Sequence, residues 1–511
     1  MRIRSSHAFV VLLCGLLTGA VTPGTRPVPS APAAAGGPPA AQVSASLARA
    51  GKSAATSRPP TLAESVGARL RRSPLRGARV GVEIVSLRDG RTLVEQNART
   101  LLSPASTMKV LTAAAALDRL GPGWQYETRF LAAGPPVDGV VAGDLFVEGR
   151  CAPDLVVERF PELASGVLAA GVREIRGDLI ADVSFFDGEE RAPEWPNGGN
   201  PNPYAAPISA LAANFSTVRI TVTPAARPGA DASVVLEPPN DAVPVSGRVK
   251  TTKGGQAVYA GRVLDRGREG GLANRIVVGG RIGAASGPWE KYIPIENPAA
   301  VAVSAVKRAL ENAGIVVRGT TRTGRAPAGA TAVYVLRSKP LAEIVRDMNK
   351  HSQNFIAEMV QRTVGAEMFG TPATRAKGAQ AVGAFLRTCG IDPAAVRLTD
   401  GSGLSRSNLL TADALVRVLV RMRQDPKVEA AFVDSLPIAA IDGTLHSRMN
   451  GLAAGRVRAK TGHIDGVTAL AGYVDDASEG PLAFAFLVND VSHPRALAAL
   501  DDLCRILCTP R

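Results

Sequence analysis

Ser106 and Lys109, in the segment Ser106-Thr107-Met108-Lys109, have the types and spacing of a nucleophile with its base. Residues three apart on a helix share a face, so the Lys109 amine can reach the Ser106 hydroxyl. Pro104 and Ser106 stand where an apolar helical run begins, which leaves unpaired backbone N–H groups beside the hydroxyl. Acyl transfer needs this combination of nucleophile, base and oxyanion donors. Arginine could not replace Lys109, because a guanidinium keeps its proton whereas a buried ammonium can lose it.

A second segment, Ser304 to Lys307, has the same Ser-x-x-Lys spacing. It lies inside an amphipathic run predicted to be helical over 299–313, and it continues into Arg308, so no helix begins at its serine. We interpret this segment as the solvated face of a helix. The nucleophile is therefore assigned to Ser106.

Two further short segments could complete such a site. Ser352-Gln353-Asn354 is the single Ser-x-Asn of the chain and leads into a helical run. On its own it would be interpreted as a helix N-cap. Lys460-Thr461-Gly462 is the single Lys-Thr-Gly and precedes an apolar strand. On its own it would be interpreted as an edge-strand lysine and a turn glycine.

The elements that must position these groups predict an α+β architecture. Apolar runs at 80–87 and 92–94 flank Asp89-Gly90, which is typical of a β-hairpin. The last part of the chain has the pattern strand, strand, helix at 468–474, 482–488 and 495–507. Helical runs are predicted at 110–120, 299–313, 341–364, 376–389 and 412–423. Helices packed on an antiparallel sheet fit this order.

The pattern of residue types changes between residues 137 and 290. Short β-like runs recur there between Gly, Pro and Asp residues, for example at 218–222 and 275–278. This pattern predicts a β-rich insertion within the α+β domain.

The order Ser-x-x-Lys, Ser-x-Asn, Lys-Thr-Gly is the active-site set of penicillin-binding proteins and serine β-lactamases. The chain resembles the low-molecular-mass class C penicillin-binding proteins, the D-alanyl-D-alanine carboxypeptidase/endopeptidases of peptidase family S13. The resemblance extends from about Thr61 to Leu507, and the long interval between Ser106 and Ser352 suits the insertion of that family. The matching segments are 103–112, 177–187, 203–207, 348–354, 400–406 and 458–462.

The resemblance implies a transpeptidase/β-lactamase-like domain of residues 61–136 and 291–511, with the insertion at 137–290. It implies a serine DD-peptidase that cleaves D-Ala-D-Ala termini, cross-links, or both, in peptidoglycan stem peptides. An acyl-enzyme would form, and β-lactams would acylate the same serine. No cofactor is implied.

The resemblance also implies a role for each catalytic residue. Ser106 would be the acylated nucleophile and Lys109 its base. Ser352 would relay a proton to the leaving amine, and Asn354 would fix side-chain positions. Lys460 would supply a positive field.

Substrate binding is implied for the strand segment Lys460-Thr461-Gly462. Thr461, together with Lys460, would hold the terminal carboxylate of the substrate. The backbone N–H groups of Ser106 and His463 would hold the oxyanion. His463 departs from the Ser or Thr common in the family, so a hydroxyl contact is lost and a pH-dependent charge is gained.

Two more residues are implied for the third stem residue, a diamino acid. Asp182 would meet its amine and Arg406 its carboxylate. The alternatives are a turn cap for Asp182 and a structural salt bridge for Arg406.

The N-terminus has the pattern of an export signal. Arg2 and Arg4 precede a ten-residue apolar run at 8–17, which is too short to span a bilayer. We predict a signal peptide at 1–20, the alternative being an uncleaved short anchor, and a disordered Pro/Ala-rich tether at 21–60. The protein is therefore expected to be exported to the periplasm or cell envelope, or secreted.

Composition limits the partners. The chain has 511 residues, 46% of them apolar, and a net charge of +14. The charge suits peripheral contact with a membrane or an anionic wall, whereas the lack of basic-aromatic interleaving argues against nucleic acid. No zinc spacing or His-Glu-x-x-His occurs, so no metal site is predicted. The oligomeric state is left open.

Two rival functions remain at this point. One is an idle wall-binding protein with the same fold, and the other is a β-lactam hydrolase. A Ser-His-Asp hydrolase is disfavoured, because the chain has no Gly-x-Ser-x-Gly elbow.

Overall fold

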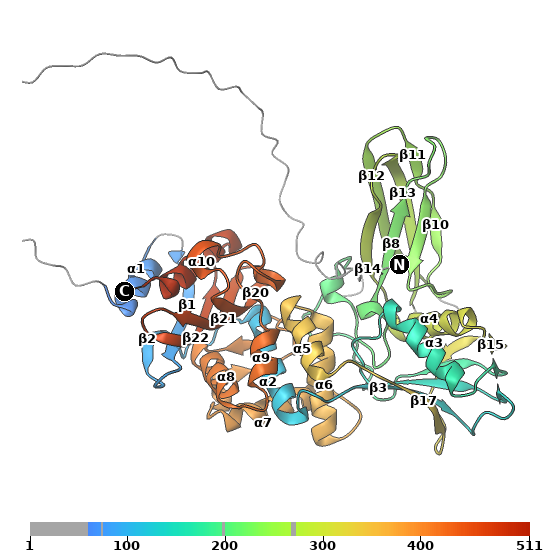
Figure 1. Cartoon of the computed structure of the whole chain (residues 1–511), viewed down its shortest axis with the longest axis horizontal. Helices are drawn as coiled ribbons and strands as arrows, with labels where there is room; N and C mark the ends of the chain where they lie inside the picture. Colours follow the sequence, from blue (N-terminus) through green and yellow to red (C-terminus); the bar gives the residue numbers. More distant parts are fainter. Residues whose placement is uncertain (1–59, 73–74, 197–199, 267–271, 511) are drawn as a thin grey trace, which may run out of the picture. The chain divides into compact units, whose positions relative to one another are not determined.

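Strands from opposite ends of the chain pair in one sheet (Figure 1). The computed structural model describes residues 60–510 apart from 73–74, 197–199 and 267–271. Strand β1 (Arg79–Ser86) is antiparallel to β22 (Gly480–Asn489) along its whole length. The sheet order is β2-β1-β22-β21-β20, all neighbours being antiparallel, with β2 (Thr92–Gln96), β20 (Val457–Ile464) and β21 (Val467–Asp476). The predicted hairpin and the final strand pair are confirmed.

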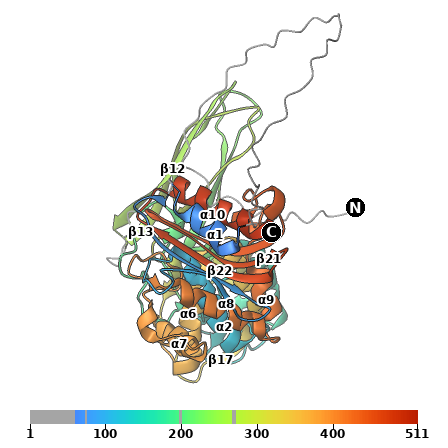
Figure 2. The same ribbon diagram turned by 90° about the vertical axis from the view of Figure 1, so that its left-hand side faces the viewer.

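Side chains alternate across this sheet, so each face has its own core. The even positions of 482–488 in β22 pack with α1 (Leu62–Leu70) and α10 (His493–Cys508). The odd positions of 483–487 pack with α2 (Met108–Leu120) and α8 (Ala412–Gln424). Figure 2 shows α1 and α10 on one side of β22 and β21, and α2 and α8 on the other. The predicted α+β class is confirmed.

The helical layer around α2 also contains α5 (Leu341–Lys350), α6 (Asn354–Phe369), α7 (Arg375–Thr388) and α9 (Glu429–Ser435). The single helical run predicted over 341–364 is wrong. The chain breaks between α5 and α6 because Ser352 has φ 56°, in the left-handed region that no right-handed helix can contain. This break presents Ser352 on a turn. A two-stranded ladder, β18 (Val396–Arg397) and β19 (Leu409–Leu410), follows α7.

The insertion is a set of sheets between α2 and α5. Its base is the sheet β16-β7-β5-β3-β17, which shares a core with α3 (Phe160–Ala169) and α4 (Pro298–Asn312). The strands are β3 (Glu127–Ala132), β5 (Leu145–Gly149), β7 (Leu179–Asp182), β16 (Thr321–Thr323) and β17 (Thr331–Arg337), with a small parallel ladder of β4 (Val140–Val141), β6 (Glu174–Ile175) and β15 (Val316–Val317) beside them.

A second core of the insertion lies between two more sheets. The long pair β12 (Gln256–Arg266) and β13 (Leu272–Gly283) projects from the rest of the insertion (Figure 1). Strand β13 also carries β10 (Val245–Gly247) and β11 (Lys250–Thr252). The other sheet has the order β14-β8-β9, with β8 (Thr217–Thr223), β9 (Ser233–Glu237) and β14 (Trp289–Pro294).

The strand pairing gives the insertion wider bounds than those predicted from the sequence. Strands β3 and β17 are antiparallel neighbours in the base sheet, so the insertion runs from about 127 to 337 rather than from 137 to 290. Helix α4 therefore belongs to the insertion. The interpretation of Ser304 as part of a solvated face is wrong: it is buried and its Oγ accepts a hydrogen bond from the Asp241 N–H at 2.8 Å.

The predicted signal peptide (1–20) and nearly all of the predicted tether (21–60) lie outside the described residues. Within the described part of the chain, no helix combines the length and apolar character that crossing a membrane requires. Cys504 and Cys508 are buried free thiols on α10.

Candidate active site

Ser106 lies in the short 3-10 turn Ala105–Thr107 that leads directly into α2. Ala105 before it has φ 44°, a left-handed conformation that costs free energy and is concentrated at functional sites. One turn later, Lys109 is fully buried. Its Nζ donates to Ser106 Oγ at 2.9 Å, to Asn354 Oδ1 at 2.7 Å and to the Ser402 carbonyl at 2.7 Å. The contact predicted from the Ser-x-x-Lys spacing is therefore present.

The turn between α5 and α6 brings in the second segment. Asn354 is the first residue of α6, and Gln353, rather than Ser352, occupies the N-cap position. Ser352 Oγ accepts a hydrogen bond at 2.9 Å from Nζ of Lys460, which is fully buried. Ser352 and Asn354 thus each contact a different lysine, and the three motifs meet.

The third segment lies on β20, the edge strand, and it packs against the turn that carries Ser106. A Cβ on Gly462 would lie 2.6 Å from the Pro104 carbonyl and 3.2 Å from the Thr107 nitrogen, so only glycine allows this approach. Thr461 Oγ1 donates to Thr444 Oγ1 at 2.8 Å. Thr444 had no signal in the sequence, because it becomes a neighbour only through the fold.

The loop 400–408 forms the floor of the site, and Arg406 is the one residue of this loop for which the sequence analysis predicts a role. Asp400 is fully buried, and its carboxylate accepts from the backbone N–H groups of Gly403 at 2.7 Å and Ser405 at 2.8 Å. These bonds hold the turn that presents the Ser402 carbonyl to Lys109. Gly403 has φ 80° and leaves no room for a Cβ, which would lie 1.9 Å from the Ala105 carbonyl.

His463 and Arg406 lie at the exposed rim of the site. The His463 ring stacks on His493, with 3.6 Å between centroids, and burial together with His463 lowers the pKa of His493 to about 4. Arg406 Nη2 donates to the Asp465 carbonyl at 2.7 Å, at the end of β20. The Arg406 side chain is exposed and also pairs with the Asp465 carboxylate at 3.6 Å, which is the kind of salt bridge named as its alternative role.

Asp182 is placed differently from these residues. It is buried at the end of β7, and its two carboxylate oxygens accept from the backbone N–H groups of Ser184 at 2.9 Å and Ala326 at 2.7 Å. Among the described residues, its hydrogen bonds all remain within the insertion. This geometry favours the turn-cap alternative.

The insertion nevertheless contacts the site through another segment. The Tyr204 carbonyl accepts from Asn354 Nδ2 at 2.9 Å, and Trp195 Nε1 donates to Asp400 Oδ2 at 2.8 Å. Glu194 Oε2 accepts from Ser405 Oγ at 2.7 Å. The insertion thus supports both Asn354 and the 400–408 loop.

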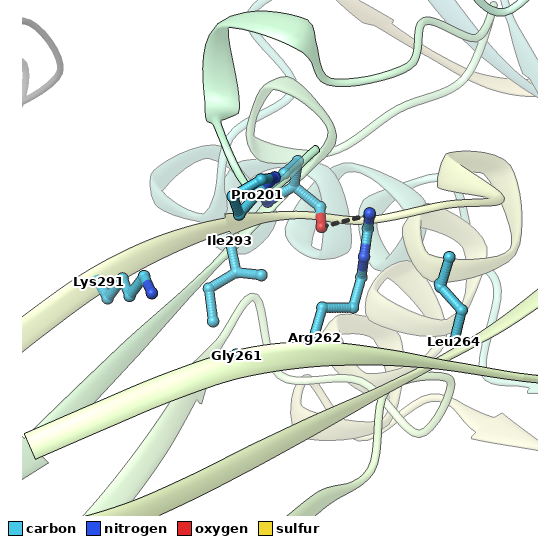
Figure 3. A pocket seen from close by; sticks show the side chains of 7 residues that line it. Pro201, Gly261, Arg262, Leu264, Lys291 and Ile293 are labelled. Atoms are coloured by element: carbon cyan, nitrogen blue, oxygen red, sulfur yellow. Dashed lines mark hydrogen bonds between the residues drawn. The ribbon is translucent and has the colours of Figure 1, made fainter. Parts of the chain in front are cut away.

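A pocket of about 270 Å³ lies elsewhere, between β12 and β14 (Figure 3). Arg262 Nη1 crosses it to donate to the Pro294 carbonyl at 2.7 Å. None of its lining residues belongs to the three motifs. Over the described residues, no group of three His, Cys, Asp or Glu side chains could hold a metal ion.

Comparison with known families decides the identity. The model of the D-Ala-D-Ala carboxypeptidase 3 (S13) family matches residues 62–508. The chain belongs to this family. The S13 chain is a serine-type D-Ala-D-Ala carboxypeptidase, and the predicted class C membership is confirmed.

Similar proteins extend over most of the S13 chain. The D-alanyl-D-alanine carboxypeptidase of Actinomadura sp. (strain R39) is 37% identical over 457 residues, covering 86% of this chain and 83% of the relative. The crystal structure of penicillin binding protein 4 from Haemophilus influenzae has a TM-score of 0.71 at 27% identity, covering 86% of this chain and 98% of that one. The same protein complexed with a novel β-lactam has a TM-score of 0.67 at 27% identity, covering 87% and 98%.

Proposed function

We propose that this S13 enzyme hydrolyses the terminal D-Ala-D-Ala bond of peptidoglycan stem peptides through an acyl-enzyme on Ser106. The observation that carries the proposal is the 2.9 Å contact between Nζ of the fully buried Lys109 and Oγ of the half-buried Ser106. Along this contact a neutral amine takes the proton of Ser106 as its oxygen attacks the carbonyl carbon. The leaving D-Ala departs as an amine, and water then cleaves the ester.

Ser352 and Lys460 serve the departure of the leaving group in this proposal. Their 2.9 Å hydrogen bond supports a path by which a proton reaches the leaving nitrogen. Asn354, which donates to the Tyr204 carbonyl and accepts from Lys109, fixes the amine in position. Lys460 adds positive charge where the substrate carboxylate would bind.

Binding of the substrate is proposed along β20. Thr461 and Lys460 hold the terminal carboxylate, and the backbone N–H groups of Ser106 and His463 hold the oxyanion. The tight approach of Gly462 to Thr107 supports this pairing, because it keeps β20 beside the nucleophile turn. Arg406 is retained for the carboxylate of the third stem residue, since its side chain lies exposed beside β20. Asp182 is withdrawn from that subsite, because both of its oxygens already accept backbone hydrogen bonds.

β-Lactams act as mimics of D-Ala-D-Ala in this proposal and acylate Ser106. The fit of the fold to the Haemophilus protein solved with a β-lactam supports this expectation. Cleavage of cross-links by the same chemistry is proposed as a second activity, because a cross-link presents the same kind of D-Ala peptide bond. The N-terminal pattern supports export to the periplasm or cell envelope.

The test uses a fluorescent penicillin and a peptide ending in D-Ala-D-Ala. We expect stable labelling of the wild type and release of D-Ala, and neither with Ser106→Ala. Ser304→Ala is the matched control, since Ser304 has the same Ser-x-x-Lys spacing and lies in the insertion. Loss of labelling with Ser304→Ala alone would overturn the choice of nucleophile. No labelling of the wild type would favour a wall-binding protein, and rapid penicillin turnover without D-Ala release would favour a β-lactamase.

We also propose that one end of the β10–β13 sheet docks on an anionic wall polymer. The ladders place Lys250 beside Arg281, and the 224–231 loop is hydrogen-bonded to Thr251. The exposed cations at this end are Arg227, Arg248, Lys250, Lys253 and Arg281, whereas the one carboxylate among residues 224–231, 247–257 and 279–288 is Asp231. Asp231 pairs with Lys250 at 2.7 Å, so a positive excess remains. Tyr259, the β12 partner of Gly279, is a large apolar side chain exposed beside these residues, and one such ring is too little apolar surface for insertion into lipid, which favours a polyanion.

This docking is tested with immobilised poly(glycerol phosphate). We expect binding that weakens with salt and that is lost when four cations are reversed to glutamate at Arg227, Arg248, Lys253 and Arg281. The matched control reverses four exposed cations of the catalytic part, namely Arg72, Arg76, Arg88 and Arg495. Equal loss in both variants, or binding to anionic lipid vesicles alone, would overturn the proposal.

A further inference from the structure

Glu358 is a buried carboxyl that the roles proposed above leave unused. It lies one turn after Asn354 on α6, with 1% of its surface exposed. Its Oε1 accepts from the backbone N–H groups of Gly401 and Ser402, each at 2.9 Å. Its Oε2 has no hydrogen-bond partner among the described residues. An unpaired charged oxygen in such a place is costly, so the environment favours the neutral acid.

Three charged groups face Glu358 from the elements packed around it. Asp400 of the floor loop opposes a second negative charge, and together with burial, the larger cause, it raises the pKa of Glu358 to about 8. Lys109 from α2 and Arg362 from α6 itself act in the other direction. Arg362 is engaged elsewhere, since its guanidinium donates to Asp187 at 3.1 Å and to Glu189 at 3.3 Å. Because a guanidinium keeps its proton, Lys109 is the one of these two cations whose protonation can respond to Glu358.

Ser402 connects Glu358 to the base. Its N–H donates to Glu358 Oε1, and its carbonyl accepts from Lys109 Nζ at 2.7 Å. Glu358 thereby positions the carbonyl that holds the amine, and its charge acts on that amine through a dry protein interior.

Resting on the acyl-enzyme mechanism proposed above, we propose that Glu358 is a positioning residue that controls the protonation of Lys109. As a neutral acid, Glu358 leaves Lys109 free to give up its proton and act as the base. As a carboxylate, it holds Lys109 in the ammonium form, which cannot accept the proton of Ser106.

The proposal predicts the direction of a pH effect. As pH rises in the wild type, either Glu358 or Lys109 can lose a proton. When Glu358 loses it, the resulting carboxylate keeps Lys109 in the ammonium form. Glu358→Gln keeps an acceptor oxygen for the N–H groups of Gly401 and Ser402 but cannot ionise. The acid limb of the acylation profile should therefore move to lower pH in Glu358→Gln, by about one unit.

The experiment measures the second-order rate constant for labelling by a fluorescent penicillin between pH 5 and 10. Glu367→Gln is the matched control, because Glu367 is exposed on the same helix. An unchanged profile in Glu358→Gln, or the same shift in Glu367→Gln, would overturn the role of Glu358. An unlabelled wild type would instead reject the acyl-enzyme mechanism, so the two failures are distinguishable.

A second measurement applies if Glu358→Gln does not fold. Glu83 is a second buried carboxyl, with a pKa raised to about 7, so the measurement uses Glu83→Gln. Infrared difference spectra of this variant across pH 6 to 10 should contain a buried protonated carboxyl band that disappears near pH 8. Its persistence to pH 10, or its loss below pH 6, would also overturn the proposal.

Discussion

At the scale of single residues, the two Ser-x-x-Lys segments make different contacts in the structure. Ser106-x-x-Lys109 begins at a helix start and meets Asn354 and Ser402, whereas Ser304-x-x-Lys307 lies within α4, where Lys307 Nζ donates to the Gly319 carbonyl at 2.8 Å. In the first segment the amine bonds to the serine of its own motif, whereas Ser304 and Lys307 each bond to a backbone group of another segment. The local setting, rather than the spacing, therefore supports Lys109 as the proposed base.

Replacing Lys109 tests this conclusion. Lys109→Arg preserves the positive charge but removes a group that can accept the proton of Ser106, because a guanidinium stays protonated. Labelling by a fluorescent penicillin should become slower by at least about 100-fold. Lys307→Arg should label at the wild-type rate. Comparable slowing in the two variants would mean that Lys109 is not the base.

At the scale of elements, the site depends on how closely β20 approaches the turn before α2. Gly462 lies at that contact, and its missing side chain lets the strand and the turn touch. The left-handed residues Ala105 and Ser352 shape the two turns that face it. Gly462 on β20, Ala105 before α2 and Ser352 before α6 are therefore explained by the contacts of the site, not by the stability of the strand or helix beside them.

Adding one methyl group should separate these elements. Gly462→Ala places a Cβ 2.6 Å from the Pro104 carbonyl, so we expect penicillin labelling to fall by at least about 100-fold and the protein to lose stability. Gly383→Ala, in α7, meets nothing within 4 Å and should stabilise the protein by about 0.5–1 kcal/mol. Labelling and thermal unfolding measure both effects. Wild-type labelling by Gly462→Ala would contradict the tight packing of β20.

The packing of β1 on α8 predicts a pH-dependent stability. Glu83 on β1 is buried, and its burial, with Asp413 and Glu95 nearby, raises its pKa from 4.5 to about 7. The folded protein holds a proton there that the unfolded chain releases, so the free energy of unfolding falls as pH rises from 4.5 through 7. Glu83→Gln should remove this slope and be about 2 kcal/mol more stable than the wild type at pH 8.

Urea unfolding at several pH values measures this effect. Glu367→Gln, an exposed carboxyl on α6 that is not among the charges named as acting on Glu83, serves as the control and should keep the wild-type slope. The same slope in Glu83→Gln and the wild type would assign the pH dependence to other groups.

At the scale of the whole molecule, the insertion takes part in building the site. Its 194–204 segment contributes Glu194, Trp195 and the Tyr204 carbonyl to the floor loop and to Asn354. These contacts join residues more than 140 positions apart in the sequence. The insertion is therefore a structural support for the chemistry as well as a separate surface.

Removing one of these contacts should weaken the site. Trp195→Phe deletes the donor to Asp400, a buried carboxylate, and should lower the free energy of unfolding by about 1.5–3 kcal/mol. The rate of penicillin labelling should fall as well, because Asp400 holds the loop that orients Ser402. Trp289→Phe, in the separate core of the insertion, should leave labelling unchanged. Unaltered labelling by Trp195→Phe would show that the floor loop is rigid without the insertion.

The amino-acid sequence by itself determined the family and the α+β class, and it supplied the reactive groups that are proposed for the site. These follow from short motifs and local periodicity, which can be recognised in the sequence without knowing which segments contact each other in the fold. Only the tertiary structure decided the edges of the insertion, the break at Ser352, the burial of Ser304 and Asp182, and the presence of Thr444 and Glu358 beside the motifs. Such features depend on contacts between separate segments, 17 residues apart for Thr461 and Thr444, 43 for Glu358 and Gly401 and 144 for Asp182 and Ala326. No local pattern encodes which of these groups will share one buried space.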